Sequence, residues 1–197
     1  MKNENKVTFY WEWLLLPKEE FNILMMLADS GGGFSGTLSD MCRYFHVSAD
    51  NSKNKIPLKT AIKSLTDNGY ITSEKSGNTF TLQVIPKERK VELLRKWVDP
   101  ILKAERFSVS VAKAPVIKSL IWISENSYSQ VVTNDQIVPE LNISVSTFGA
   151  AKNVLEKIIN HDGEMFGASE VECGNYRNLS VESAVVEAKR YLADLEG

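Results

Sequence analysis

A twelve-residue segment recurs in this chain after 96 positions, and this repeat constrains the fold more than any other feature. The first copy covers residues 37–48 and the second covers residues 133–144. Each copy begins at a Thr suited to capping a helix and ends at a Ser suited to capping the next one. The repeat therefore predicts, twice, a short helix, a turn and the start of a second helix. The apolar positions coincide in the pairs Met41 with Ile137, Cys42 with Val138, Phe45 with Leu141 and Val47 with Ile143.

The segments before the two copies follow one order. Residues 7–16 are predicted to form a strand, and Pro17 then opens a helix of about a dozen residues. Before the second copy, residues 107–111 alternate like a strand, and Pro115 opens another helix. The first strand is expected to place Phe9, Trp11 and Trp13 on one face and Tyr10, Glu12 and Leu14 on the other.

The segments after the two copies also agree. Residues 58–65 have apolar side chains at helical spacing, Asn68-Gly69 stops that helix, and residues 71–75 and 79–84 flank a hairpin turn. After the second copy, residues 148–158 repeat the helical spacing, and residues 164–181 form a longer candidate hairpin. Strand, helix, helix, turn, helix and hairpin are thus predicted in the same order twice.

This order resembles the winged helix–turn–helix superfamily, over roughly residues 7–86 and 107–182. The segments that carry the resemblance best are residues 38–82 and 133–158. The resemblance implies an α+β, mostly helical fold with a first winged unit at 1–86 and a second unit at 107–182. The spacing of apolar residues adds a linker helix at 87–106 and a C-terminal helix at 183–197. The first unit departs from the pattern, because its turn carries extra residues at roughly 49–54.

Two amphipathic stretches lie outside the repeated units. Residues 87–105 place Val91, Leu94, Val98 and Ile101-Leu102 on one side of a helix, and residues 181–195 repeat apolar positions in the same way. These helices either pack together within one chain or form the seam of a homodimer, which would suit a protein that binds two DNA half-sites. Both possibilities stay open.

The resemblance implies that the second helix of the first unit is a recognition helix that enters the DNA major groove. Opposite its apolar face lie Lys59, Thr60, Lys63 and Ser64. Three polar residues just before the helix are expected to meet phosphates, and three at the wing are expected to meet a flanking groove or phosphates. These are Lys53, Asn54 and Lys55 before the helix and Lys75, Ser76 and Asn78 at the wing. The alternative is an ordinary solvated helix face.

The second unit is a weaker candidate for DNA contact because it is acidic. Residues 37–90 carry a charge of +4, whereas residues 128–197 carry −6 within a chain of net charge −2. The second unit is therefore either a lesser DNA contact or a protein-binding or dimerising relative of the first. Its polar candidates are Ser146, Thr147, Lys152 and Asn153, and its hairpin carries Glu164, Glu170 and Glu172.

Catalytic chemistry has little support in the sequence. His46 and His161 fall at the ends of predicted helices, and no His–Asp pair lies near Cys42, which is expected in the core. Gly31-Gly32-Gly33 lacks the Lys-Ser/Thr of a phosphate loop. We therefore expect no enzyme activity, no metal and no cofactor. The cysteine usage, the lack of a signal-like N-terminus and the lack of a long apolar run predict a cytoplasmic protein without membrane partners.

These patterns favour sequence-specific binding of double-stranded DNA. The resemblance extends to transcriptional regulators and to replication initiators of bacteria, plasmids and phages. The alternative is a non-catalytic interaction protein, similar to winged-helix subunits of chromosome-segregation or replisome-type complexes. The overall acidity of the chain favours this alternative.

Overall fold

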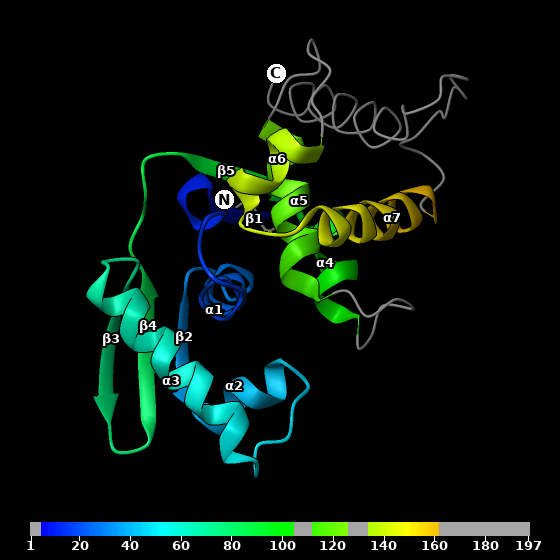
Figure 1. Ribbon diagram of the computed structural model, residues 1–197. Helices are drawn as coiled ribbons and strands as arrows, with labels where there is room; N and C mark the ends of the chain where they lie inside the picture. Colours follow the sequence, from blue (N-terminus) through cyan, green and yellow to red (C-terminus); the bar gives the residue numbers. More distant parts are fainter. Residues whose placement is uncertain (1–4, 105–111, 126–133, 162–197) are drawn as a thin grey trace, which may run out of the picture. The chain divides into compact units, whose positions relative to one another are not determined.

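The computed structural model describes residues 5–104, 112–125 and 134–161, without the side chains of 134–135 and 156–161. The chain has an α+β fold and divides into two compact units, Met1–Leu94 and Arg95–Gly197 (Figure 1). In these residues no helix combines the length and the apolar character that crossing a membrane requires.

The first unit opens on a short strand that differs from the predicted one. β1 (Lys6–Tyr10) ends where the chain turns into a 3-10 helix, η1 (Trp11–Trp13). The prediction of a strand over 7–16 is therefore wrong beyond Tyr10. The physical reason is packing: the turn buries Trp13 and Leu14 together with Phe9, whereas a continued strand would put Leu14 on the opposite face from Phe9.

The partner of β1 is β5 (Lys90–Leu94), and this corrects the predicted linker helix. The two strands pair antiparallel, with Phe9 opposite Val91 and Val7 opposite Leu93. Helical structure begins only at Arg95, so the helix predicted over 87–106 is wrong for residues 87–94, of which 90–94 form β5. Val91 and Leu94 are three apart and fit a helix, but buried Val91 and Leu93 with exposed Lys90 and Glu92 fit a strand.

Helix α1 (Lys18–Asp29) follows Pro17 as predicted and forms the centre of the first unit. Its residues 23–28 are all buried, so the core surrounds it on nearly every side. The chain then turns through Gly31 and Gly32, which both have positive φ, into a strand that the sequence did not predict, β2 (Gly33–Thr37).

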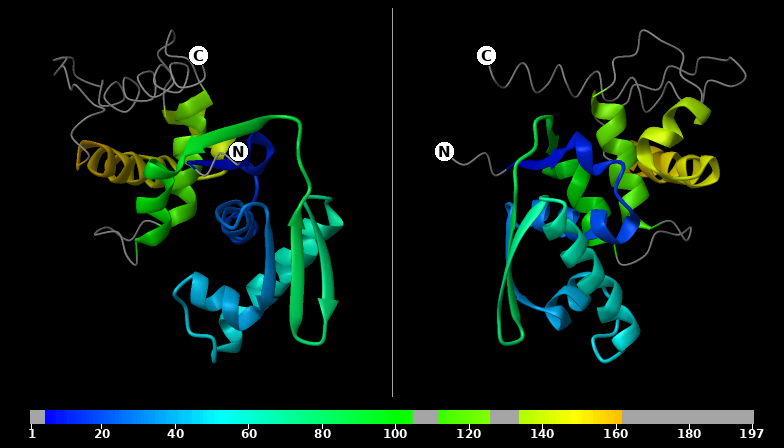
Figure 2. Two further views of the ribbon diagram at one scale, coloured as in Figure 1. Left: turned by 180° about the vertical axis from the view of Figure 1, so that it is seen from behind. Right: turned by 60° about the vertical axis from the view of Figure 1, so that its left-hand side comes forward.

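Strand β2 lies at one edge of a three-stranded antiparallel sheet in the order β2-β4-β3 (Figure 2). The predicted hairpin is confirmed as β3 (Ile71–Ser76) and β4 (Thr79–Val84), joined at Gly77 with φ 59°. The glycines of β2 make room for neighbours: a Cβ at Gly33 would lie 2.4 Å from the Gln83 side chain, and one at Gly36 would lie 2.6 Å from the Phe34 ring.

Two helices follow β2 in the first unit. Thr37 caps α2 (Leu38–Tyr44) as predicted, in a capping box with Asp40. α3 (Ser52–Asp67) is capped by Asn51 and not by Ser48, which corrects that prediction. Asn51 takes this place because its side chain reaches the free N–H of Lys53, and the helix ends at Asn68 and Gly69 as predicted.

The described part of the second unit consists of helices. α5 (Lys113–Glu125) is buried from Ala114 to Ser124 and packs against α4 (Arg95–Lys103), α6 (Asn134–Leu141) and α7 (Val145–His161). The helix predicted to open at Pro115 is present and begins at Lys113. The predicted strand at 107–111, the hairpin at 164–181 and the C-terminal helix at 183–197 lie outside the described residues.

The repeat reappears as a matching turn in the two units. His46 and Asn142, 96 residues apart, both have positive φ, at 54° and 50°. The N–H of Val47 donates to Cys42 O and that of Ile143 to Val138 O, as in a Schellman helix end. In the helices that follow, the offset between equivalent residues is 90 and not 96. The buried residues Leu58, Ala61 and Leu65 of α3 correspond to Phe148, Ala151 and Leu155 of α7. The extra residues of the first unit lie partly in its turn and partly in the first turn of α3.

Candidate nucleic-acid interface

Helix α3 is held by one apolar face. Leu58, Ala61, Ile62 and Leu65 are buried, and the helix packs against α1, α2 and β3. These residues recur at three and four positions, so the other side of the helix must face solvent. The sequence prediction of the buried face is therefore confirmed.

The opposite face of α3 carries the predicted contact residues. Lys59, Thr60 and Lys63 are exposed and Ser64 is half-buried, with its hydroxyl 3.3 Å from Asn68 Nδ2. The side chains of the lysines and of Thr60 are thus available to a ligand.

The three polar residues expected before the helix lie inside it. Lys53, Asn54 and Lys55 belong to the first turn of α3, because the helix begins at Ser52 and not near Leu58. Lys53 is exposed, whereas Asn54 braces the turn by donating its amide to Ser48 O at 2.9 Å. Asn54 therefore has a structural contact, and Lys53 extends the cationic face by one turn.

The positions of the lysines in α3 lower the stability of the helix. Lys55, Lys59 and Lys63 are four residues apart, a spacing at which like charges repel. No acidic residue lies in the first turn, where the helix dipole would favour one over Lys53 and Lys55. Across the part of the chain that the structure describes, no ion pair involves any of these four lysines. An anion bound from outside would relieve this repulsion.

One residue on this face was not predicted from the sequence. Ile56 has 60% of its surface exposed and follows Lys53 by three residues and precedes Thr60 by four, so these side chains share one side of the helix. Ile56 precedes Leu58, where the apolar pattern of the predicted helix begins, so its place on this face could not be read from that pattern.

The β3–β4 hairpin presents the predicted wing residues. Lys75, Ser76 and Asn78 are exposed at its end, and the Lys75 ammonium lies 5.6 Å from the centre of the Phe80 ring. Lys87 stabilises the base of the hairpin. Its ammonium donates to Gly69 O at 2.8 Å and lies 4.5 Å from the Tyr70 ring centre. The wing thus has an anchored base and a polar tip, although exposed Glu74 lies beside Lys75.

The corresponding helix of the second unit is less suited to phosphate. Ser144 caps α7, and its hydroxyl lies 3.0 Å from that of Ser146 and 2.8 Å from that of Thr147. Lys152 is half-buried with its ammonium 5.2 Å from the Phe148 ring centre, and Asn153 is exposed. Among the α7 side chains that the structure describes, up to Leu155, the candidates lie on or beside the helix surface and form no row of exposed lysines.

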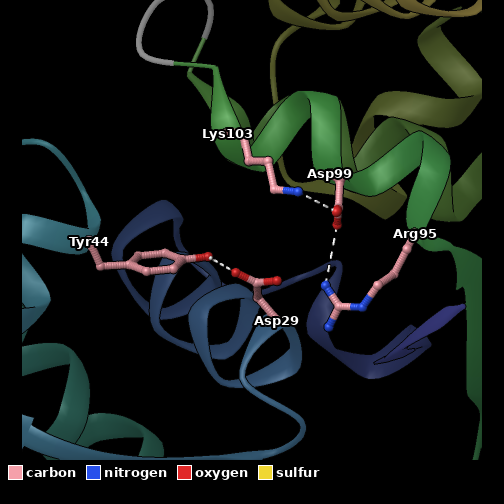
Figure 3. A network of polar contacts seen from close by, with 5 residues as sticks. All are labelled: Asp29, Tyr44, Arg95, Asp99 and Lys103. Atoms are coloured by element: carbon pink, nitrogen blue, oxygen red, sulfur yellow. Dashed lines mark hydrogen bonds and ion pairs between the residues drawn. The ribbon is translucent and has the colours of Figure 1, made fainter. Parts of the chain in front are cut away.

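Some cations elsewhere in the two units form ion pairs with acidic neighbours. In the second unit, Asp99 pairs with Arg95 at 3.2 Å and with Lys103 at 2.6 Å along α4 (Figure 3). In the first unit, Arg43 pairs with Asp40, whose pKa is lowered first by the backbone N–H of Thr37, then by the Thr37 hydroxyl and by Arg43. The lysines of α3 differ from these in lacking such partners among the described residues.

One buried cation contacts the turn between α6 and α7 in the second unit. Lys118 on α5 is only 2% exposed and donates to Leu141 O, at the end of α6, at 2.9 Å. Burial lowers the pKa of Lys118 to about 8. The role of this lysine is to position the turn between α6 and α7 and is not predicted by the sequence pattern.

Features of an enzyme are sparse in the described residues. They contain no group of three or more His, Cys, Asp or Glu side chains placed to hold a metal ion. Cys42 is a buried free thiol, as expected for a core residue. His46 lies in the turn after α2.

Comparison of the chain with protein-family models, with curated proteins and with solved structures gives no match.

Proposed function

We propose that the first unit is a winged helix–turn–helix module that binds double-stranded DNA through α3 and the β3–β4 wing. The chain order α1, β2, α2, α3, β3, β4 and the sheet order β2-β4-β3 support this assignment. So does the Schellman turn between α2 and α3.

The observation that carries the proposal is the lysine row on α3, which has no ion-pair partner among residues 5–104, 112–125 and 134–161. Lys55, Lys59 and Lys63, with Lys53 before them, concentrate like charge on a helix that lacks a compensating acid in its first turn. Such an arrangement lowers helix stability by itself and becomes favourable when it meets phosphates. The side chains that α3 buries are Leu58, Ala61, Ile62 and Leu65, and none of these lysines is among them.

The residues would divide their roles by position. Lys59, Thr60 and Lys63 would meet base edges and adjacent phosphates as α3 lies in the major groove. Lys53 would contact the backbone from the first turn of the helix. Lys75, Ser76 and Asn78 would reach a flanking groove or phosphates from the wing.

The second unit is proposed as the companion module of a tandem protein. The positive φ shared by His46 and Asn142 supports a common origin of the two turns. The half-buried Lys152 and the acidity of residues 128–197 favour a positioning or protein-binding role over direct DNA contact. Whether the chain then serves transcription regulation or replication initiation in a bacterium, plasmid or phage stays a prediction.

A homodimer through the 87–105 and 181–195 segments receives less support than packing within one chain. The apolar residues that would line such a seam, Val91, Leu94, Val98, Ile101 and Leu102, are all buried in a single copy. Residues 181–195 lie outside the described residues, so a homodimer through these segments stays a prediction.

Photo-cross-linking to random-sequence duplexes tests the proposal directly. Duplexes carrying 5-iodouracil are incubated with the full chain at low ionic strength and irradiated, and the attached peptides are identified by mass spectrometry. We expect cross-links in α3 and at the β3–β4 turn. Cross-links confined to α7, or no binding at any ionic strength, would contradict the assignment and favour a protein-interaction role.

A further inference from the structure

The exposed face of α3 contains an apolar side chain that packing does not explain. Ile56 is 60% exposed, whereas Leu58, Ala61, Ile62 and Leu65 already fill the buried side of the helix. Its neighbours along the exposed face are Lys53, three residues before, and Thr60, four residues after. Ile56 is thus an apolar group inside a cationic and polar surface.

The position of Ile56 indicates what would cover it. Recognition helices place their N-terminal residues nearest the base edges, and Ile56 is the fifth residue of α3. In the major groove, the apolar group that a duplex offers is the C5-methyl of thymine. A duplex held by Lys53, Lys59 and Lys63 would bring such a methyl over Ile56, whereas a protein partner would need an acidic surface around an apolar centre.

We infer that Ile56 contacts the C5-methyl group of a thymine and so determines sequence preference at one base pair of the DNA site. This inference rests on the proposed DNA binding by α3 and adds to it a base and the atom that is recognised. Burial of one methyl group corresponds to about fourfold in affinity.

Replacement of thymine by deoxyuridine isolates that methyl group. A duplex site is selected from random sequences with the full chain, and each thymine is then replaced by deoxyuridine in turn. Dissociation constants are measured by fluorescence anisotropy for the wild-type chain, for Ile56→Ala and for Leu15→Ala. Leu15 is a matched control because it is 61% exposed in the same unit and lies outside the described helices and strands.

The expected result is one thymine whose replacement weakens the wild-type chain and Leu15→Ala by about fourfold and leaves Ile56→Ala unchanged. The inference is overturned if every replaced duplex binds the wild-type chain as well as the parent does, or if Ile56→Ala responds like the wild type. In both cases DNA binding by α3 would still stand. Absence of any duplex binding would overturn the proposed function and this inference together. Circular dichroism of Ile56→Ala checks that the variant folds.

Discussion

Replacement of Lys118 by Met should change how the stability of the second unit depends on pH. The Lys118 ammonium is buried and its pKa is lowered from 10.5 to about 8 in the folded chain. Between these two values the unfolded chain holds a proton that the folded chain has released, so the free energy of unfolding rises as the pH rises. The full difference corresponds to roughly 3 kcal/mol.

Most of that difference should appear in an accessible pH range. Between about pH 7 and about pH 10, the free energy of unfolding of the wild-type chain should rise by roughly 2 to 3 kcal/mol relative to Lys118→Met. Titrations of all other groups are shared by the two proteins and cancel in the comparison. At pH 7 the variant loses the hydrogen bond to Leu141 O but also the cost of burying a charge.

Fluorine NMR during urea unfolding can follow the second unit by itself. Incorporated 5-fluorotryptophan gives separate signals for Trp97 and Trp122, which lie on α4 and α5. Ser119→Ala is the matched control, because Ser119 is a buried polar residue of the same helix without an ionisable side chain. A constant difference between wild type and Lys118→Met across this pH range would refute the account of Lys118.

Two smaller changes test the turns and caps. Thr37→Ala should lower the free energy of unfolding of the first unit by about 1 kcal/mol in urea, since it removes the capping box with Asp40; an unchanged midpoint would contradict this role. His46→Gly should raise stability by up to about 1 kcal/mol, because glycine adopts positive φ without strain. Asn142→Gly should raise it less, because Asn tolerates that conformation; equal gains in thermal unfolding would refute the argument.

The repeat explains why much of the fold could be predicted from the sequence. The spacing of Leu58, Ala61, Ile62 and Leu65 fixes a buried helix face, and Asn68-Gly69 ends that helix in the expected way. The 96-residue offset even predicts the matching turns at His46 and Asn142, because the apolar residues beside them occupy equivalent places. Each of these features is determined by residues that lie close together in the sequence.

Other elements depend on contacts that the sequence does not reveal. β2 contains two glycines, Gly33 and Gly36, which leave room for the Gln83 side chain and the Phe34 ring. The strand therefore lacks the alternation of apolar and polar side chains by which strands are predicted. β5 fits a helix or a strand equally well until β1 pairs with it. Asn51 and Ser48 are both good caps, and the length of the turn selects Asn51.

The candidate site was predicted in its composition but not in its full extent. Lys59, Thr60 and Lys63 lie on the exposed face as expected. Pro57 obscured the start of the helix, because proline removes the N–H that would bond to Lys53 O, and residues before it look non-helical. Lys53 and Ile56 therefore join the face only once the longer helix is known.

The salt dependence of duplex binding tests the central claim most directly. The affinity of the full chain for a random-sequence duplex is measured between roughly 50 and 200 mM salt, with Lys59→Ala/Lys63→Ala compared with Lys18→Ala/Lys90→Ala. Both pairs are exposed lysines of the first unit, so the loss of net charge is matched, although Lys90 forms an ion pair with Glu92. The account predicts that the slope of log affinity against log salt becomes shallower by about two in the α3 variant and stays unchanged in the control. Equal slopes in the two variants would contradict it.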